Sequence, residues 1–168
     1  MTSAHHPKRI EPTRGQRSVW DFPRPPAIEA EPRGVTVELN GVVIASTERA
    51  KKVLETSLAP SYYIPPEDID MSKLRKTPGV KTFCEWKGYP TYYDVAADGA
   101  SAEAAAFSYD NPTESFREIA GWVSFYPGKV ICRVGGDVAE PQAGGFYSGW
   151  ITPDVVGPFK GEPGTEGW

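Results

Sequence analysis

Residues 35–45 read VTVELNGVVIA, and this stretch decides the fold class. Apolar and polar side chains alternate before Asn40 and Gly41, and a second β-rich run follows them. Alternation with a period of two is typical of a half-buried strand, and Asn-Gly between two such runs is the strongest short signal of a β-hairpin. We therefore predict two antiparallel strands joined by a type I′ turn at Asn40 and Gly41.

Further strand-like runs follow along the chain, separated by turn-forming Gly, Pro and Asn residues. Two short helices are also predicted, one from Glu48 to Ser57 and one that begins at Asn111 and ends at Gly121. The expected extended segments are 61–64, 80–86, 91–95 and 104–109, followed by a second hairpin that joins 122–126 to 130–134.

The order of these elements indicates a mainly β (α+β) protein with antiparallel sheets, because short turns connect successive strands. No long helix alternates with the strands, which argues against Rossmann and P-loop folds. The 168 residues suit one domain, and their 17 Gly and 17 Pro argue against a helical bundle. We predict a Pro-rich N-terminal arm (1–33), a β core (34–136) and a C-terminal arm rich in Gly, Pro and aromatic residues (137–168).

Composition excludes several classes of function. A net charge of −4 and a pI near 5.3 disfavour binding to a nucleic acid polymer or to an anionic membrane. No apolar run approaches the length of a membrane span, and no apolar segment follows the basic N-terminus, so a cytoplasmic location is expected. Cys84 and Cys132 form no CxxC pair, which excludes a cysteine-only zinc site and favours two free thiols.

Three segments place titratable side chains among aromatic ones. Arg49 and Glu55 share the first predicted helix, and Cys84 and Lys87 share the run at 82–88. The third segment contains Tyr62 and Tyr63, which on a strand point to opposite faces, so that one packs in the core while the other can offer its hydroxyl to a pocket. The simpler interpretation of each segment is structural: a solvated helix face, two packing tyrosines and a small apolar cysteine.

The spacing of these motifs resembles a family found in bacteria and fungi, catalogued as domain of unknown function 427 and provisionally labelled a nucleotidyltransferase. The similar positions span about residues 35–134, and the two arms resemble those of longer members. The residues that carry the resemblance are 40–45, Arg49, 53–56, 62–65, Asp68, Thr82, Cys84, 87–88, Tyr92, Phe107, Tyr109, Pro112, 119–121 and 125–126.

The resemblance implies an antiparallel β-tent, or Mss4-like, architecture with two short helices. Zinc-binding relatives of that architecture use paired CxxC knuckles, which this sequence lacks, so zinc is not implied. The nucleotidyltransferase label implies a metal-bound nucleotide held by paired carboxylates on a strand. No Asp-x-Asp or Glu-x-Glu pair lies on a predicted strand, so we assign no metal ligands and leave the cofactor open.

The resemblance also covers polar and reactive side chains that a β core would not require. A shared pocket for a small-molecule ligand follows as an expectation. In it, the catalytic candidates are Glu55 and Cys84, and the ligand-binding candidates are Arg49, Tyr63, Lys87, Tyr92 and Tyr109.

Three hypotheses about function stay open at this point. The first is an enzyme that acts on an anionic, nucleotide-like small molecule. The second is a non-catalytic module that binds a metabolite or a protein, and the third is a structural domain in which the same residues form a buried polar network. The arms could pack on their own domain or on a second subunit, which would make a homodimer.

Overall fold

The structure is a computed structural model that describes residues 9–79, 82–84 and 86–168. Strands make up 42% of it and helices 10%, which confirms the prediction of a mainly β protein with antiparallel sheets. No helix in the described part of the chain is long and apolar enough to cross a membrane. The described helices are all short 3-10 helices: η2 (Val19–Asp21), η3 (Pro66–Asp68), η4 (Met71–Lys73) and η5 (Glu114–Ile119).

The predicted first hairpin is confirmed and forms half of a four-stranded sheet. Asn40 and Gly41 have φ angles of 51° and 80°, the positive values that a type I′ turn needs at both central positions. The strands of this sheet, in spatial order, are β12 (Asp137–Val138), β11 (Ile131–Val134), β3 (Val35–Leu39) and β4 (Val42–Thr47).

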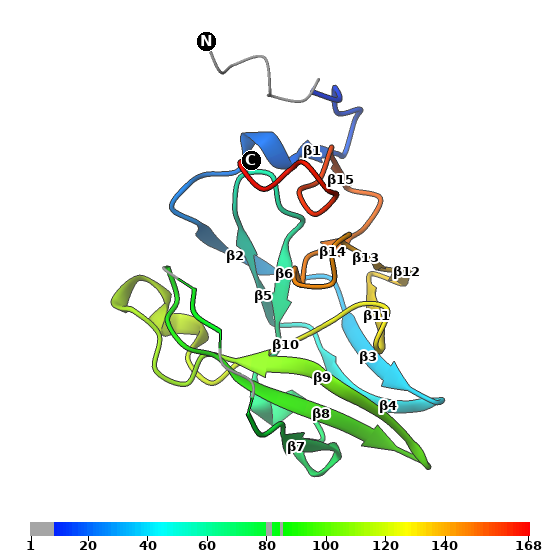
Figure 1. Cartoon of the computed structure of the whole chain (residues 1–168). Coiled ribbons are helices and arrows are strands. Elements are labelled where there is room, and N and C mark those ends of the chain that lie inside the picture. Colours follow the sequence, from blue (N-terminus) through cyan, green and yellow to red (C-terminus); the bar gives the residue numbers. More distant parts are fainter. Residues whose placement is uncertain (1–8, 80–81, 85) are drawn as a thin grey trace.

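A second four-stranded sheet contains the other long hairpin, which turns at Asp98 and Gly99. Figure 1 shows both hairpins extending toward the same end of the molecule. The strands of this sheet, in spatial order, are β10 (Val123–Phe125), β9 (Ala100–Ser108), β8 (Thr91–Ala97) and β7 (Leu74–Lys76).

One strand pairing predicted from local sequence is wrong. Segments 122–126 and 130–134 do not pair with each other, because β10 pairs with β9 and β11 pairs with β3. The Pro-Gly turn between them instead carries the chain from one sheet to the other. Residues 80, 81 and 85 of the predicted strand 80–86 lie outside the described residues, and Cys84 forms only an isolated bridge with Gly88.

A third sheet replaces the first predicted helix. Residues 48–57 do not form a helix, because Ala50–Leu54 is strand β5, paired on one side with β2 (Ala27–Glu31) and on the other with β6 (Ser61–Tyr63). The expectation that residues 1–33 are irregular is wrong at β2, which is an edge strand as its Pro-rich surroundings require. Pairing on both sides of β5 overrides its helical spacing of apolar residues.

The second predicted helix is present in part. η5 is a 3-10 helix that begins after Thr113, not an α-helix capped by Asn111. The Thr113 hydroxyl donates to the carbonyl oxygen of Trp86 at 2.5 Å, so it makes no cap and holds the neighbouring loop in place. Phe116 and Ile119 are buried as the helical pattern predicted.

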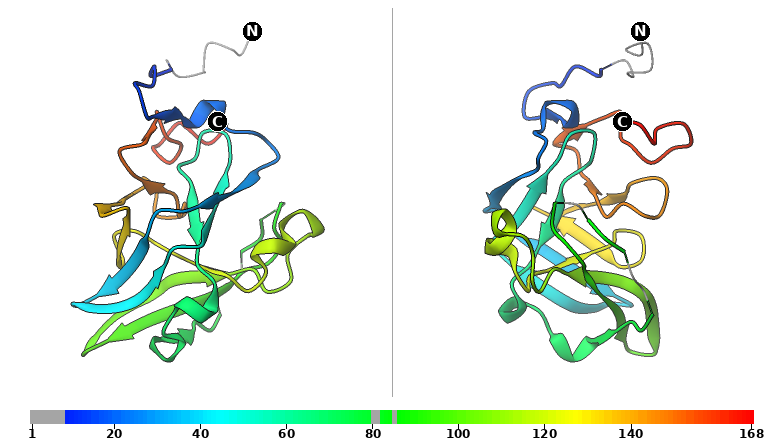
Figure 2. Two further views of the ribbon diagram at one scale, coloured as in Figure 1. Left: turned by 180° about the vertical axis from the view of Figure 1, so that it is seen from behind. Right: turned by 60° about the vertical axis from the view of Figure 1, so that its left-hand side comes forward.

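Parts of both arms lie side by side at one end of the domain, where residues 17–18 pair with residues 155–156 (Figures 1 and 2). β1 (Arg17–Ser18) runs parallel to β15 (Val155–Val156), and β13 (Glu140–Pro141) pairs with β14 (Trp150–Ile151). Trp150 is fully buried, and its indole N–H donates to the carbonyl oxygen of Phe125 at 2.9 Å. The C-terminal arm thus contributes a side chain to the main core.

A cluster of buried charges joins β2, β5 and the C-terminal arm. Glu31 is 2% exposed, and its carboxylate accepts hydrogen bonds from Arg33 at 2.7 and 2.9 Å and from Lys52 at 3.2 Å. Arg33 also donates to Asp154 at 3.0 Å. Burial favours the neutral acid, but the bonds from Arg33 and Lys52 outweigh this effect and lower the pKa of Glu31 to about 2.

Replacing this carboxylate tests whether the cluster stabilises the fold. We expect Glu31→Gln to lower the free energy of unfolding by about 1.5–3 kcal/mol, the range for hydrogen bonds to a charged group. The matched control is Glu29→Gln, because Glu29 lies on the same strand but pairs with Arg17 at an exposed site. The control should cost less than about 1 kcal/mol in urea unfolding, and an equal effect of both substitutions would contradict the prediction.

The same pair of proteins predicts a pH dependence. A carboxylate with a lowered folded-state pKa stabilises the fold above its ordinary pKa of 4.5, and this contribution disappears as the pH falls toward about 2. The difference in unfolding free energy between the wild type and Glu31→Gln should therefore shrink as the pH falls below 4.5. Denaturant unfolding at a series of acidic pH values measures it, and a constant difference would refute the assignment.

Candidate functional site

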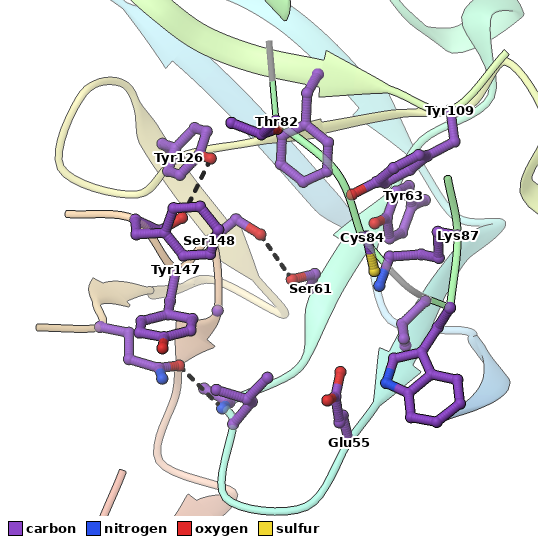
Figure 3. Close-up of a pocket in the computed structure, with 18 of the residues that line it drawn as sticks. Glu55, Ser61, Tyr63, Thr82, Cys84, Lys87, Tyr109, Tyr126, Tyr147 and Ser148 are labelled. Carbon is purple, nitrogen blue, oxygen red and sulfur yellow. Dashed lines mark hydrogen bonds between the residues drawn. The ribbon is translucent and has the colours of Figure 1, made fainter. Parts of the chain in front are cut away.

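A cavity of about 300 Å³ opens between the sheets and the C-terminal arm. The described lining residues come from β5, β6, β8 and β9, from the segments that follow β5, β9 and β10, from residues 82–84 and 86–87, and from the segment 142–160. Figure 3 shows Lys87, Cys84 and Tyr109 on one side of this space and Tyr147 and Ser148 on the other.

The floor of the cavity depends on the alternation of side chains along β6. Tyr62 points into the main core, where its ring lies 4.9 Å from that of Trp150. The next residue, Tyr63, points the other way into an aromatic cluster beneath the cavity, with its ring 6.0 Å from Phe107. This matches the prediction that one tyrosine of the pair is core and the other faces a pocket.

Cys84 and Lys87 enter the cavity from one tight turn. The backbone N–H groups of Lys87 and Gly88 both donate to the carbonyl oxygen of Cys84, at 3.2 and 2.7 Å. The turn brings two side chains that are three residues apart to the same cavity. Both side chains are therefore placed by this turn.

Lys87 is buried among aromatic rings. The residue is 8% exposed, and its Nζ atom lies 5.6 Å from the ring centroid of Tyr109 and 5.5 Å from that of Phe116. Among the described residues, no carboxylate forms an ion pair with this ammonium group. Aromatic faces attract a cation but do not neutralise it, so the cavity retains an electropositive point.

Tyrosine hydroxyls surround the same space. Burial raises the pKa values of Tyr63, Tyr109 and Tyr126 above that of an exposed tyrosine. The neighbouring Cys84 adds to the increase at Tyr109. These phenols stay protonated and can donate hydrogen bonds. Tyr92, the remaining predicted tyrosine, lines the cavity with its hydroxyl 3.0 Å from that of Thr82.

Glu55 lines the edge of the cavity nearest the arms. Its side chain is 18% exposed, and one carboxylate oxygen lies 3.9 Å from Nε of Arg24. Arg24 in turn donates to the backbone carbonyl of Thr56 at 3.0 Å. A residue of the N-terminal arm therefore partly balances the charge of the one carboxylate that the described lining residues supply.

Arg49 does not lie with the other predicted site residues. Its guanidinium donates to Asp68 at 3.0 Å, it is 59% exposed, and it is not among the described residues that line the cavity. A helix would have placed Arg49 about 9 Å along the axis from Glu55, whereas an extended chain separates them by roughly 20 Å. The extended conformation of this segment is the physical reason that Arg49 lies apart from Glu55 and the cavity.

The C-terminal arm supplies lining residues that sequence reasoning did not assign to a site. The arm was predicted only to wrap over the domain, and no motif within it signals a cavity wall. Ser148 shares a hydrogen bond of 2.9 Å with Ser61 across the opening. The lining residues from the arm are Gln142, Phe146, Tyr147, Ser148, Gly149 and Lys160.

The described donor atoms do not fit a divalent metal ion. Glu55 is the single carboxylate among the described lining residues, and no group of three His, Cys, Asp or Glu side chains with metal-binding geometry occurs in the described ranges. β2 does carry Glu29 and Glu31, a Glu-x-Glu pair on a segment that was predicted to be irregular. Both carboxylates are already bound to cationic side chains, so no step is derived through a metal.

Comparison with known proteins agrees with the resemblance seen in the sequence. No curated protein matches the chain. The profile of a family described as a domain of unknown function (DUF427), which also carries a nucleotidyltransferase label, matches residues 27–135. This match covers more than half of the chain, begins at β2 and ends after β11, so the chain belongs to the DUF427 family.

Proposed function

We propose that the cavity binds a small anionic molecule with a planar ring, such as a nucleotide-like metabolite. The observation that carries the proposal is the burial of the Lys87 ammonium group without an ion-pair partner among the described residues. A buried charge is costly unless it is paired, and a ligand anion would supply the missing partner. Lys87 is therefore the anchor of the site.

The surroundings of Lys87 support a ring-bearing ligand. Aromatic faces can stack against a planar ring, and protonated phenols can donate hydrogen bonds to an anion. A volume of about 300 Å³ lies at the lower end of the range for small-molecule sites, which favours a molecule no larger than a mononucleotide. The residues in these roles are Tyr63, Tyr92, Tyr109 and Lys87.

A catalytic role is the second candidate, because the turn at 84–88 places a thiol and an ammonium group in the same cavity. Cys84 would act as the nucleophile and Glu55 as the acid–base group, since a nearby cation favours the thiolate form of a cysteine. The alternative is a module that binds a ligand or a protein without changing it. Exposed Phe83 and Phe146, both at the opening, support that alternative.

The role of the Lys87 charge is tested with pairs of similar ligands, one anionic and one neutral. Thermal shifts are measured with benzoate and benzamide and with AMP and adenosine, each added near 100 times its dissociation constant or to its solubility limit. Binding at that level adds about 2.7 kcal/mol, which for this size raises Tm by roughly 5–10 °C. We expect shifts with the anions and smaller ones with the neutral analogues.

Lys87→Met should weaken anion binding by about 10- to 150-fold, the loss of one charge-assisted contact of about 1.5–3 kcal/mol. The matched control is Lys51→Met, because Lys51 also lies over an aromatic ring, that of Trp122, but outside the cavity. Arg49→Met is a second control. Equal affinities for anions and neutral analogues, or unchanged affinity in Lys87→Met, would contradict the proposal.

The catalytic candidate is tested by the reactivity of the two thiols. Cys84 lines the cavity, whereas Cys132 is fully buried and burial raises the pKa of its thiol. Iodoacetamide should alkylate Cys84 in the folded protein and Cys132 only after unfolding, as peptide mass spectrometry would show. If Lys87 activates the thiol, alkylation of Cys84 slows in Lys87→Met and is unchanged in Lys51→Met; unchanged rates in both would favour the binding module.

A further inference from the structure

The cavity contains a second cation, and it comes from the C-terminal arm. Lys160 lines the cavity, and its Nζ atom lies 5.7 Å from the ring centroid of Tyr147. We infer that Lys160 forms a second anion-binding subsite, so that the preferred ligand carries an anionic group at each of two ends of a small, ring-bearing molecule. The inference rests on the proposed function and deepens it.

The wall that carries Lys160 is held in place by the core. The side-chain oxygen of Gln142 accepts a hydrogen bond of 3.1 Å from the backbone N–H of Ala59, and its amide nitrogen donates to the carbonyl oxygen of Lys160 at 2.5 Å. The backbone N–H of Lys160 donates to the carbonyl oxygen of Ser57 at 2.9 Å. Both backbone polar groups of Lys160 are therefore bound, which fixes the origin of its side chain.

Close backbone contacts also hold this wall in place. A Cβ atom on Gly149 would lie 2.6 Å from the carbonyl oxygen of Ala59, so a larger residue cannot occupy this position without moving the arm. The next residue is the fully buried Trp150. The wall is therefore a fixed part of the folded domain, and its lysine lines the cavity.

The two lysines lie on different walls. Lys87 comes from the turn at 84–88 and lies over Tyr109. Lys160 lies over the ring of Tyr147, and Figure 3 shows that ring on the opposite side of the cavity from Lys87. Within the described ranges, neither ammonium group forms an ion pair. A ligand with one anionic group can neutralise one of them, and a ligand with two separated anionic groups can neutralise both.

The second subsite lies outside the region that the family model matches. The family match ends at residue 135, before the segment 142–160 begins. The first subsite, with Lys87 and its tyrosines, lies inside the matched region. In this chain, the matched region therefore carries the first subsite and the arm carries the second.

Benzoate and terephthalate test the inference, because they share one ring and differ by a second carboxylate at the opposite end. In calorimetric titrations, we expect terephthalate to bind the wild type about tenfold or more tightly than benzoate, the effect of one further charge-assisted contact. Lys160→Met should remove this preference. Lys129→Met is the matched control, because Lys129 lies 5.4 Å from the Tyr126 ring but does not line the cavity.

Each outcome separates the inference from the function on which it rests. The second subsite is overturned if terephthalate binds no more tightly than benzoate, or if the preference for terephthalate survives Lys160→Met. The proposed function still stands in that case, provided that benzoate or AMP binds in a way that depends on Lys87. Absence of binding by benzoate, terephthalate and AMP overturns both. The comparison of the two probes on the wild type needs no variant, so it decides the question even if Lys160→Met fails to fold.

Discussion

The alternation of side chains along β6 is the constraint on which the core and the cavity both depend. Tyr62 packs against Trp150 with no exposure, and Tyr63 points to the other face, beneath the cavity. The register that pairs Tyr63 with Lys51 and Tyr62 with Lys52 fixes this assignment. A slip of one residue would exchange the two tyrosines, because every side chain of a strand would move to the opposite face. Since Trp150 belongs to the C-terminal arm, the contact between Tyr62 and Trp150 also packs that arm against the domain.

Sequence reasoning succeeded where the determining interactions are local. The Asn40-Gly41 turn specifies its own hairpin, and adjacent tyrosines on any strand must face opposite ways. It failed where pairing with distant residues decides: β5 has helical spacing but lies between two strands, and the extended chain leaves Arg49 paired with Asp68, away from the cavity. The contribution of Lys160 could not be foreseen, because only the folded arm brings it to the cavity.

Charged side chains fall into two groups according to their surroundings. Glu31 is buried but receives hydrogen bonds from two cations, as expected of a group whose role is to hold strands and arm together. Lys87 is nearly as buried, yet the described part of the chain gives it aromatic faces in place of a carboxylate. This contrast directs attention to the cavity, because a folded protein tolerates an unpaired buried charge mainly where something else can pair with it.

The folded domain extends beyond the region of sequence similarity, because Trp150 lies outside the matched region but inside the main core. The family match ends at residue 135, but the core that it encloses is completed by an indole fifteen positions further on. A fragment trimmed to the matched region would leave the ring of Tyr62 without its cover and the carbonyl oxygen of Phe125 without its indole donor, and would present apolar surface to solvent. Such a fragment would be prone to self-association, so the folded unit of this chain is longer than the matched region.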